Sequence, residues 1–244
     1  MGKIHVLMKK EEIDEAKMNG KTAVVFDVLL ATSTIITLLE NGAKEVIPVL
    51  DETRARETAA SMEKNSYLLA GEYEGRTIEG FLDPNPSFLK DKVKGKSVIL
   101  STTNGTVAIH GAGLAKHVYA CSLLNSQATA EHFEKFHRDD SIVLVCSGSS
   151  GQFCIEDFYG AGYFADCLLS ASSYTLTDAA RAAVLFSRSQ RSQAEELMKA
   201  SRVGEMLSMY GFEEEITYIT QHSSCKAIGV LSGSKMMKYE EMTE

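Results

Sequence analysis

Acidic side chains follow three of the most apolar runs in this 244-residue chain. They are Asp27, Glu72 and the adjacent pair Glu156 and Asp157. If these runs are neighbouring strands, the carboxylates that follow them can meet, and carboxylate oxygens are ligands that Mg²⁺ prefers. We therefore expect a Mg²⁺ site at these four residues. A simpler alternative for Glu156 and Asp157 is favourable charge at a helix N-terminus, which needs no metal.

Small hydroxyl and glycine residues follow apolar runs at three places, within residues 25–34, 98–106 and 143–151. Each place leads into a helix-like segment. In an open parallel sheet, ligands bind outside the carboxyl ends of the strands, where free N–H groups and helix N-termini hold anions. We therefore expect a phosphate site, with capped strand–helix connections as the alternative. The residues predicted to form it are Thr32, Ser33, Thr34, Thr102, Thr103, Gly105, Ser147 and Gly148, with Asn104 as a catalytic candidate beside them.

The overall composition narrows the class of partner. A net charge of −8 argues against a general binder of nucleic acid or of acidic membranes, because such a protein needs a basic face. No apolar run approaches the roughly 18 residues of a membrane span. The five cysteines are odd in number and form no C-x-x-C pair, which is typical of free thiols in a reducing compartment. We expect a cytoplasmic protein that binds a small anionic phospho-acid.

Several familiar phosphate and hydrolase motifs are incomplete. Lys94–Ser97 resembles the end of a P-loop, but the first glycine of that motif is missing and the segment precedes a strand. Cys146 lacks the arginine that a cysteine phosphatase needs six residues later, where Gln152 stands. Residues 148–151 are one residue too short for the serine hydrolase elbow. The six histidines do not cluster in sequence, so a zinc site or a histidine base has little support.

Strand-like and helix-like segments alternate along almost the whole chain, which predicts a mainly parallel sheet covered by helices on both faces. The predicted fold class is a three-layer α/β/α architecture. Residues 71–94 break the alternation with prolines and glycines, so we expect a long connection there. We expect residues 1–244 to form a single unit, with two closely associated α/β halves that meet near residues 71–95 as the alternative. The expected strands are 4–7, 22–28, 45–50, 67–70, 97–101, 117–120, 141–146 and 227–231.

Several short runs of the chain together resemble one known family. They are Phe26-Asp-Val-Leu, Ala31-Thr-Ser-Thr, Leu69-Ala-Gly-Glu, Ile78-Glu-Gly-Phe with Asn85, Thr102-Thr-Asn-Gly-Thr, Cys146-Ser-Gly, Gly151-Gln-Phe, Glu156-Asp, Asp178-Ala-Ala-Arg181 and Gly211-Phe-Glu. In that order they resemble the 2-phosphosulfolactate phosphatase (ComB-like) family over nearly the whole chain. The resemblance implies a three-layer α/β/α fold and a Mg²⁺-dependent phosphatase that hydrolyses (R)-2-phospho-3-sulfolactate to 3-sulfolactate and inorganic phosphate. It also implies a step in sulfolactate biosynthesis, which in methanogens serves coenzyme M biosynthesis.

Two segments depart from the family pattern. Leu30 stands where the family commonly has an arginine, so one cation for a phosphate or sulfonate group is absent. The run Gly80-Phe-Leu-Asp-Pro-Asn-Pro-Ser keeps Asn85 but moves the acidic residue and adds prolines. Arg76 and Arg181 are candidates to compensate for the missing arginine. Because Arg181 matches a family motif, we expect it to bind substrate.

The expected mechanism leaves several alternatives open. Asp27, Glu156 and Asp157 are expected to hold Mg²⁺, while Glu72 is either a further ligand or the base for the attacking water. Direct attack by water and an aspartyl-phosphate at Asp27 are both compatible with the residues. A phosphatase for another small phospho-acid and a non-catalytic phosphometabolite-binding protein are the alternative functions. The sequence also leaves open whether the protein forms a homodimer.

Overall fold

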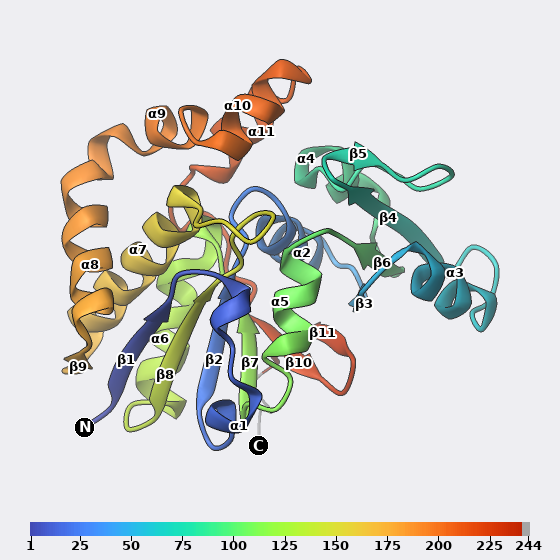
Figure 1. Ribbon diagram of the computed structural model, residues 1–244. Coiled ribbons are helices and arrows are strands. Elements are labelled where there is room, and N and C mark those ends of the chain that lie inside the picture. The colour runs from blue at the N-terminus through green and yellow to red at the C-terminus, as the bar shows by residue number, and fades with distance from the viewer. Residues whose placement is uncertain (241–244) are drawn as a thin grey trace.

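One continuous sheet of eleven strands runs through the computed structural model, which describes residues 1–240 (Figure 1). The strands lie in the order β5-β4-β6-β3-β11-β10-β7-β2-β8-β1-β9. Their bounds are β1 (Lys3–Leu7), β2 (Thr22–Phe26), β3 (Glu45–Val49), β4 (Tyr67–Tyr73), β5 (Arg76–Thr77), β6 (Ser97–Ser101), β7 (His117–Ala120), β8 (Ser141–Cys146), β9 (Thr175–Leu176), β10 (Gly229–Ser232) and β11 (Lys235–Lys238). The α-helices are α1 (Glu15–Met18), α2 (Ala31–Glu40), α3 (Glu52–Ala60), α4 (Pro86–Leu89), α5 (Gly105–Gly111), α6 (Ser126–Phe136), α7 (Ile155–Ala171), α8 (Asp178–Gln190), α9 (Ala194–Lys199), α10 (Arg202–Met209) and α11 (Glu213–Ile219).

Two parallel blocks make up the sheet. Strands β7, β2, β8, β1 and β9 pair in parallel, and so do β3, β6 and β4. The hairpin β10–β11 joins the two blocks, because β10 pairs antiparallel with β7 and β11 pairs antiparallel with β3. The predicted three-layer α/β/α fold with a mainly parallel sheet is therefore confirmed.

Both faces of the central strands are buried. Consecutive residues of a strand point to opposite faces, and in these strands the residues on both faces are mostly apolar and buried. In β2, Val24 and Phe26 belong to the core that α6, α7 and α8 cover. Ala23 and Val25 belong to the core that α2 and α5 cover on the opposite face. Helix α3 covers the smaller block. Within the described part of the chain, no helix combines the length and the apolar character that crossing a bilayer requires.

Most predicted elements are present with their ends shifted by only a few residues. The segment predicted to be one long connection is partly regular, since β4 extends to Tyr73 and the segment also contains β5 and α4. The predicted last strand is β10, and β11 follows it without having been predicted. β9 and α1 were also not predicted, because segments of two to four residues carry too little hydrophobic periodicity to be recognised.

Helices α9, α10 and α11 lie across the carboxyl ends of the parallel strands of the larger block (Figure 1). We call these three helices the helical cap. Ser87 of α4 is tied to the cap through Glu215 of α11, whose carboxylate accepts from the Ser87 N–H at 3.1 Å and also from its hydroxyl. The cap thus covers the edge at which α/β sheets bind ligands.

Candidate functional site

A cavity of about 380 Å³ lies between the carboxyl edge of the sheet and the helical cap. Its lining comes from six segments, within residues 27–31, 72–77, 83–85, 102–104, 148–157 and 202–212. The four carboxylates of Asp27, Glu72, Glu156 and Asp157 all line it, so the loops that carry them do converge. Their part in binding a metal stays a prediction.

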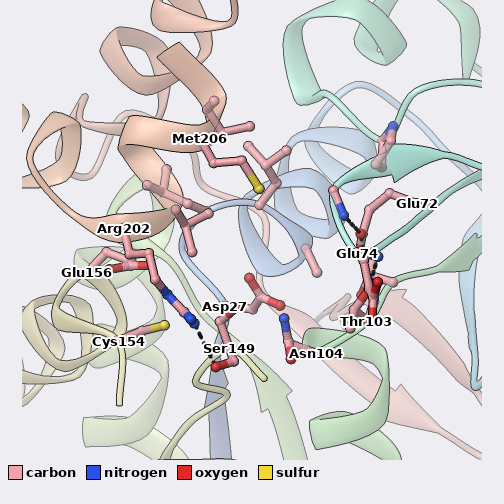
Figure 2. A pocket seen from close by; sticks show the side chains of 18 of the residues that line it. Asp27, Glu72, Glu74, Thr103, Asn104, Ser149, Cys154, Glu156, Arg202 and Met206 are labelled. Atoms are coloured by element: carbon pink, nitrogen blue, oxygen red, sulfur yellow. Dashed lines mark hydrogen bonds between the residues drawn. The ribbon is translucent and has the colours of Figure 1, made fainter. Parts of the chain in front are cut away.

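Asp27 lies at the centre of this cavity, directly after β2 (Figure 2). Its side chain is buried. Burial, together with the negative charges of Glu72 and Glu156, raises the pKa of Asp27 to about 7. The N–H of Ala31 and the charge of Lys10 act in the opposite direction. A carboxylate in this setting is costly to ionise unless a cation binds beside it.

Asp157 joins two loops that border the cavity. Its Oδ1 accepts a hydrogen bond from the Val28 N–H at 2.9 Å, and its Oδ2 accepts one from the Gly148 N–H at 3.0 Å. Gly148 has a φ of +65°, and a Cβ there would lie 2.5 Å from the carbonyl oxygen of Gln152. Burial and the charge of Asp27 raise the pKa of Asp157. Because backbone donors already occupy both of its oxygens, Asp157 holds the two loops in register.

Glu72 ties the turn after β6 to the β4–β5 hairpin. Its Oε1 accepts from the Thr103 N–H at 2.7 Å, and its Oε2 accepts from the Gly75 N–H at 2.7 Å and the Thr103 hydroxyl at 3.1 Å. The Thr103 hydroxyl accepts in turn from the Glu74 N–H at 3.0 Å. Because both oxygens of Glu72 already accept hydrogen bonds from these two segments, its role in the structure is to position Thr103.

The amide of Asn104 is oriented by Lys10. The Lys10 ammonium donates to Asn104 Oδ1 at 2.8 Å, and Figure 2 shows the amide nitrogen facing the carboxylate of Asp27. Sequence patterns gave no signal for Lys10, because it precedes Asn104 by 94 residues and only the fold brings the two together. The arrangement places a fixed N–H donor beside Asp27.

The turn after β6 places three further predicted residues. Thr102 and Thr103 line the cavity. The Thr102 hydroxyl accepts from the Thr106 N–H at 3.2 Å, so it is used within the first turn of α5. Gly105 packs against Asp27, and a Cβ on it would lie 2.5 Å from Asp27 Oδ2. A residue without a side chain is thus needed beneath the carboxylate.

Thr32, Ser33 and Thr34 do not cap α2, and they are absent from the lining of the cavity within the described residues. The helix begins at Ala31, before all three residues, so they lie in its first turn. Their hydroxyls donate to the carbonyl oxygens of Asp27, Val28 and Pro84 at 2.9, 2.8 and 2.6 Å respectively. These hydroxyls stabilise the β2–α2 turn, and the part of the three residues in phosphate binding stays a prediction.

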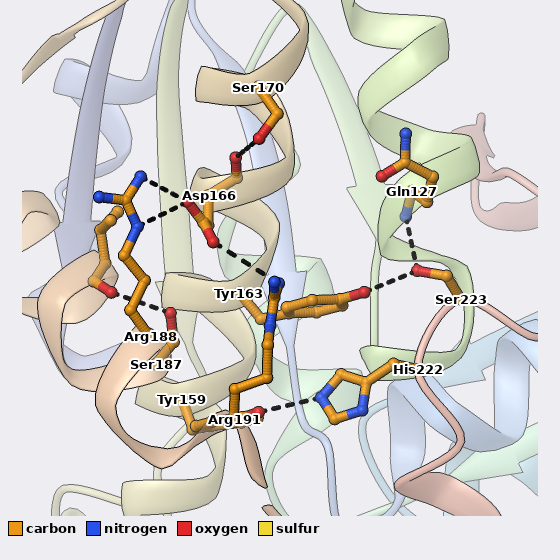
Figure 3. A network of polar contacts seen from close by, with 11 residues as sticks. Gln127, Tyr159, Tyr163, Asp166, Ser170, Ser187, Arg188, Arg191, His222 and Ser223 are labelled. Carbon is orange, nitrogen blue, oxygen red and sulfur yellow. Dashed lines mark hydrogen bonds and ion pairs between the residues drawn. The ribbon is translucent and has the colours of Figure 1, made fainter.

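Ser147 and Arg181 also lie outside the lining of the cavity, although both were predicted to bind substrate. Ser147 is fully buried beside Gly148, and its hydroxyl has no hydrogen-bond partner among the described residues. Arg181 lies on α8 and lines a separate depression. Nearby, Arg188 and Arg191 form ion pairs with Asp166 at 2.7 and 3.5 Å (Figure 3). The family motif at Arg181 therefore belongs to the outer face of α8 rather than to this site.

Arg202, the first residue of α10, reaches the cavity from the helical cap. Its guanidinium donates to the carbonyl oxygen of Ser149 at 2.7 Å. Burial raises the pKa of Glu156, and the charge of Arg202 partly offsets that rise. Figure 2 shows the Arg202 side chain passing beside Glu156 towards Ser149. Arg202 was not predicted from the sequence. Hydrophobic periodicity can indicate a helix, but it does not show which edge of the sheet that helix covers.

The cysteines at the site are unsuited to nucleophilic attack. Cys154 lines the cavity and Cys146 ends β8 close by. Burial and the neighbouring carboxylates raise the pKa of both thiols well above the usual range, so both remain protonated. This agrees with the rejection of a cysteine phosphatase from the sequence.

The acidic side of the cavity fits a hard cation. Its donors are carboxylate oxygens, and a divalent ion would relieve the repulsion that raises the pKa of Asp27. Within residues 1–240, no three or more His, Cys, Asp or Glu side chains are already gathered as a metal site. Mg²⁺ commonly binds through one or two carboxylates, with water and substrate phosphate as its other ligands. Asp27 and Glu156 are the better candidates for that kind of site, because Glu72 and Asp157 each accept backbone N–H groups on both carboxylate oxygens.

Comparison with known sequences adds an independent observation. A sequence model of the family described as 2-phosphosulpholactate phosphatase matches residues 7–234. Relatives named probable 2-phosphosulfolactate phosphatase are similar over most of this chain. The one from Clostridium novyi (strain NT) is 36% identical over 218 residues, covering 88% of this chain and 91% of the relative. The one from Clostridium perfringens (strain SM101 / Type A) is 39% identical over 220 residues and covers 88% of each, and the one from Clostridium acetobutylicum is 41% identical over 184 residues, covering 74% and 77%.

Proposed function

This chain belongs to the 2-phosphosulpholactate phosphatase family, and on that basis we propose that it hydrolyses (R)-2-phospho-3-sulfolactate with the help of Mg²⁺. Over the whole reaction, the bond between phosphorus and the ester oxygen breaks and an oxygen of water becomes bonded to phosphorus. The leaving oxygen takes up a proton and becomes the hydroxyl of 3-sulfolactate. The other product is inorganic phosphate.

The negative charge of the cavity supports the proposed dependence on Mg²⁺. The acidic lining residues are Asp27, Glu72, Glu74, Asp83, Glu156 and Asp157, while Arg202 is the one lysine or arginine among the described lining residues. The proposed substrate is itself a polyanion, with phosphate, carboxylate and sulfonate groups. A cavity of this sign binds such a substrate favourably only when a cation offsets the repulsion. Mg²⁺ bound there would neutralise charge on the phosphoryl oxygens.

The surrounding residues have separate roles in the proposed reaction. Asp27 and Glu156 hold the cation. The amide nitrogen of Asn104, fixed by Lys10, donates to a phosphoryl oxygen and stabilises the charge that develops there. Glu72 and Asp157 position the turns that border the reacting group.

Asp27 has two possible roles in the bond-forming step. It either accepts a proton from the attacking water or attacks phosphorus itself to give an aspartyl-phosphate, which water then hydrolyses. The two routes differ in the stereochemistry at a phosphorus made chiral with oxygen isotopes. Direct attack by water is one displacement and inverts the configuration, whereas the covalent route is two displacements and retains it.

Release of inorganic phosphate from a panel of phospho-acids tests the function directly. We expect the wild type to release phosphate from 2-phosphosulfolactate in Mg²⁺ and to stop when EDTA removes the metal. Asp27→Asn should lower kcat by about 1,000-fold or more with the fold intact. Asp91→Asn, at an exposed position outside the cavity, is the matched control and should keep normal turnover. Turnover that survives EDTA would contradict the role of Mg²⁺.

The same panel separates the alternative functions. A faster reaction with another small phospho-acid would change the assigned substrate while keeping the chemistry. Binding without release of phosphate from any compound would favour a phosphometabolite-binding protein. All five cysteines are buried free thiols, which supports our proposal of a cytoplasmic location.

A further inference from the structure

Among the described residues that line the acidic cavity, Arg202 of the helical cap is the one with a cationic side chain. Leu30 also lines the cavity, and it stands where members of this family commonly have an arginine. Arg202 is therefore the candidate to bind a second anionic group of the substrate.

The position of Arg202 leaves most of its donors free for a ligand. Arg202 is the first residue of α10, and the N-terminus of that helix is capped by the Ser201 hydroxyl, which accepts from the Gly204 N–H at 3.0 Å. One terminal nitrogen of the guanidinium donates to the Ser149 carbonyl at 2.7 Å. A guanidinium has five N–H donors in a planar fork, so the other donors can bind an oxyanion through two parallel hydrogen bonds.

The wall beside Arg202 is apolar on the side of the helical cap. Val203, Met206, Leu207 and Phe212 come from the same cap and line the same cavity. A guanidinium is more weakly hydrated than an ammonium, so it pairs with an oxyanion at less cost on such a wall. A sulfonate offers three oxygens and little affinity for protons, which suits this surrounding.

Arg202 and the Asn104 amide, which is assigned to the phosphate, lie apart. In Figure 2 the Arg202 guanidinium and the Asn104 amide flank Asp27 from opposite sides. A phosphoryl group beside Asp27 and Asn104 would direct the rest of the substrate towards the cap.

A second polar side chain in the cavity, that of Asn85, has an amide oxygen with no hydrogen-bond partner among the described residues. Asn85 is 3% exposed and lines the cavity. It precedes α4 but its side chain does not cap that helix. Because the unpaired atom is an acceptor, it can accept a hydrogen bond from an O–H or N–H group in the cavity but cannot bind an oxyanion.

We propose that Arg202 determines the specificity of this site by binding the sulfonate group of the substrate, an inference that rests on the proposed function. Arg202 thereby supplies the cation that Leu30 does not. The discrimination arises because a substrate without the sulfonate loses the charge-assisted pair with the guanidinium and leaves the acidic cavity without that anchor.

Steady-state kinetics with two substrates test this role. The substrates are 2-phospho-3-sulfolactate and 2-phospholactate, which lacks the sulfonate. We expect the wild type to favour the sulfonated compound in kcat/KM by about 100-fold or more. Arg202→Met should lower kcat/KM for the sulfonated substrate by about 100-fold and change that for 2-phospholactate by less than about threefold. Arg202→Lys should recover part of the preference, because it keeps the charge but lacks the fork.

The controls separate recognition from a structural role. If Arg202 only holds Ser149, both substrates lose activity equally in Arg202→Met, and that result overturns the proposal. Arg54→Met, at an exposed ion pair on α3, should leave the ratio between substrates unchanged. A wild type that hydrolyses neither substrate would refute the proposed function instead. Calorimetric titration with 3-sulfolactate then gives the answer for Arg202 alone, because binding that Arg202→Met does not weaken would also overturn its role.

Discussion

The ammonium of Lys10 and the amide oxygen of Asn104 lie 2.8 Å apart in a hydrogen bond that fixes which way the amide points. Its nitrogen is thereby turned towards Asp27 (Figure 2). Lys10 also ion-pairs with Glu11 at 3.1 Å, so it is held on both sides. An N–H donor that is already oriented costs no reorganisation when charge develops on a phosphoryl oxygen.

The first prediction concerns this orientation. Lys10→Met should lower kcat by about tenfold, because the freed amide can turn its oxygen towards phosphate and repel it. Asn104→Asp should lower kcat more, since it adds a negative charge at the same place. Lys64→Met, at an exposed position away from the cavity, is the control and should behave as wild type. An unchanged kcat in Lys10→Met would show that the amide is not oriented by Lys10.

The second prediction concerns the stability cost of Asp27. Its pKa is about 7 in the folded protein, against 3.8 for an ordinary Asp side chain. The folded state therefore holds a proton that the unfolded state has lost between these values, and stability falls as pH rises from about 4 through 7. In EDTA, Asp27→Asn should be about 2–4 kcal/mol more stable than wild type at pH 8, with little difference near pH 4.

Urea denaturation at the two pH values measures this difference. Mg²⁺ should stabilise the wild type at pH 8 and leave Asp27→Asn unaffected, because a ligand stabilises only the state that binds it. Equal stabilisation of both proteins by Mg²⁺ would place the cation elsewhere.

The third prediction concerns Asp157, where the change to Asn should lower the stability of the protein instead of raising it. Asp157→Asn keeps one acceptor but directs an NH₂ group at the N–H of either Val28 or Gly148. We expect a loss of about 1–3 kcal/mol in the free energy of unfolding, since a buried donor is left without a partner. Activity should fall with it, because the two loops that Asp157 joins line the cavity. The same denaturation series decides the matter, and a stabilised Asp157→Asn would refute the positioning role.

The fourth prediction tests the packing beneath Asp27. A methyl group in Gly105→Ala would lie 2.5 Å from Asp27 Oδ2, so the carboxylate must move. We expect kcat to fall by at least about tenfold, because small displacements of reacting groups are costly. Gly111→Ala, in the same helix, meets only the flexible end of Ile13 at 3.1 Å and is the matched control. Normal kinetics in Gly105→Ala would mean that the position of this carboxylate is not critical.

Some of this site could be predicted from the sequence because it depends on local order. Asp27 follows β2 and Gly148 follows β8, and these strands pair in parallel, so their carboxyl ends lie at one edge. Thr103 follows β6 of the other parallel block, beyond the antiparallel hairpin β10–β11, so strand order alone does not bring it to Asp27.

Other parts of the site depend on contacts between distant segments. Arg202 and Lys10 reach the cavity from the two ends of the chain, and no local pattern links either to Asp27. Thr32 has the residue type of a cap, but its hydroxyl is taken by the carbonyl of Asp27. Arg181 follows a family motif whose position on α8 is set by helix packing, which composition does not reveal.

A crystal structure of the protein grown with Mg²⁺ and inorganic phosphate would test the account most directly. We expect an octahedral ion with metal–oxygen distances of about 2.1 Å to a carboxylate oxygen of Asp27 and to the phosphate. The phosphate should also accept a hydrogen bond from the amide nitrogen of Asn104. An ion or a phosphate bound away from Asp27, with this cavity filled by water alone, would contradict it.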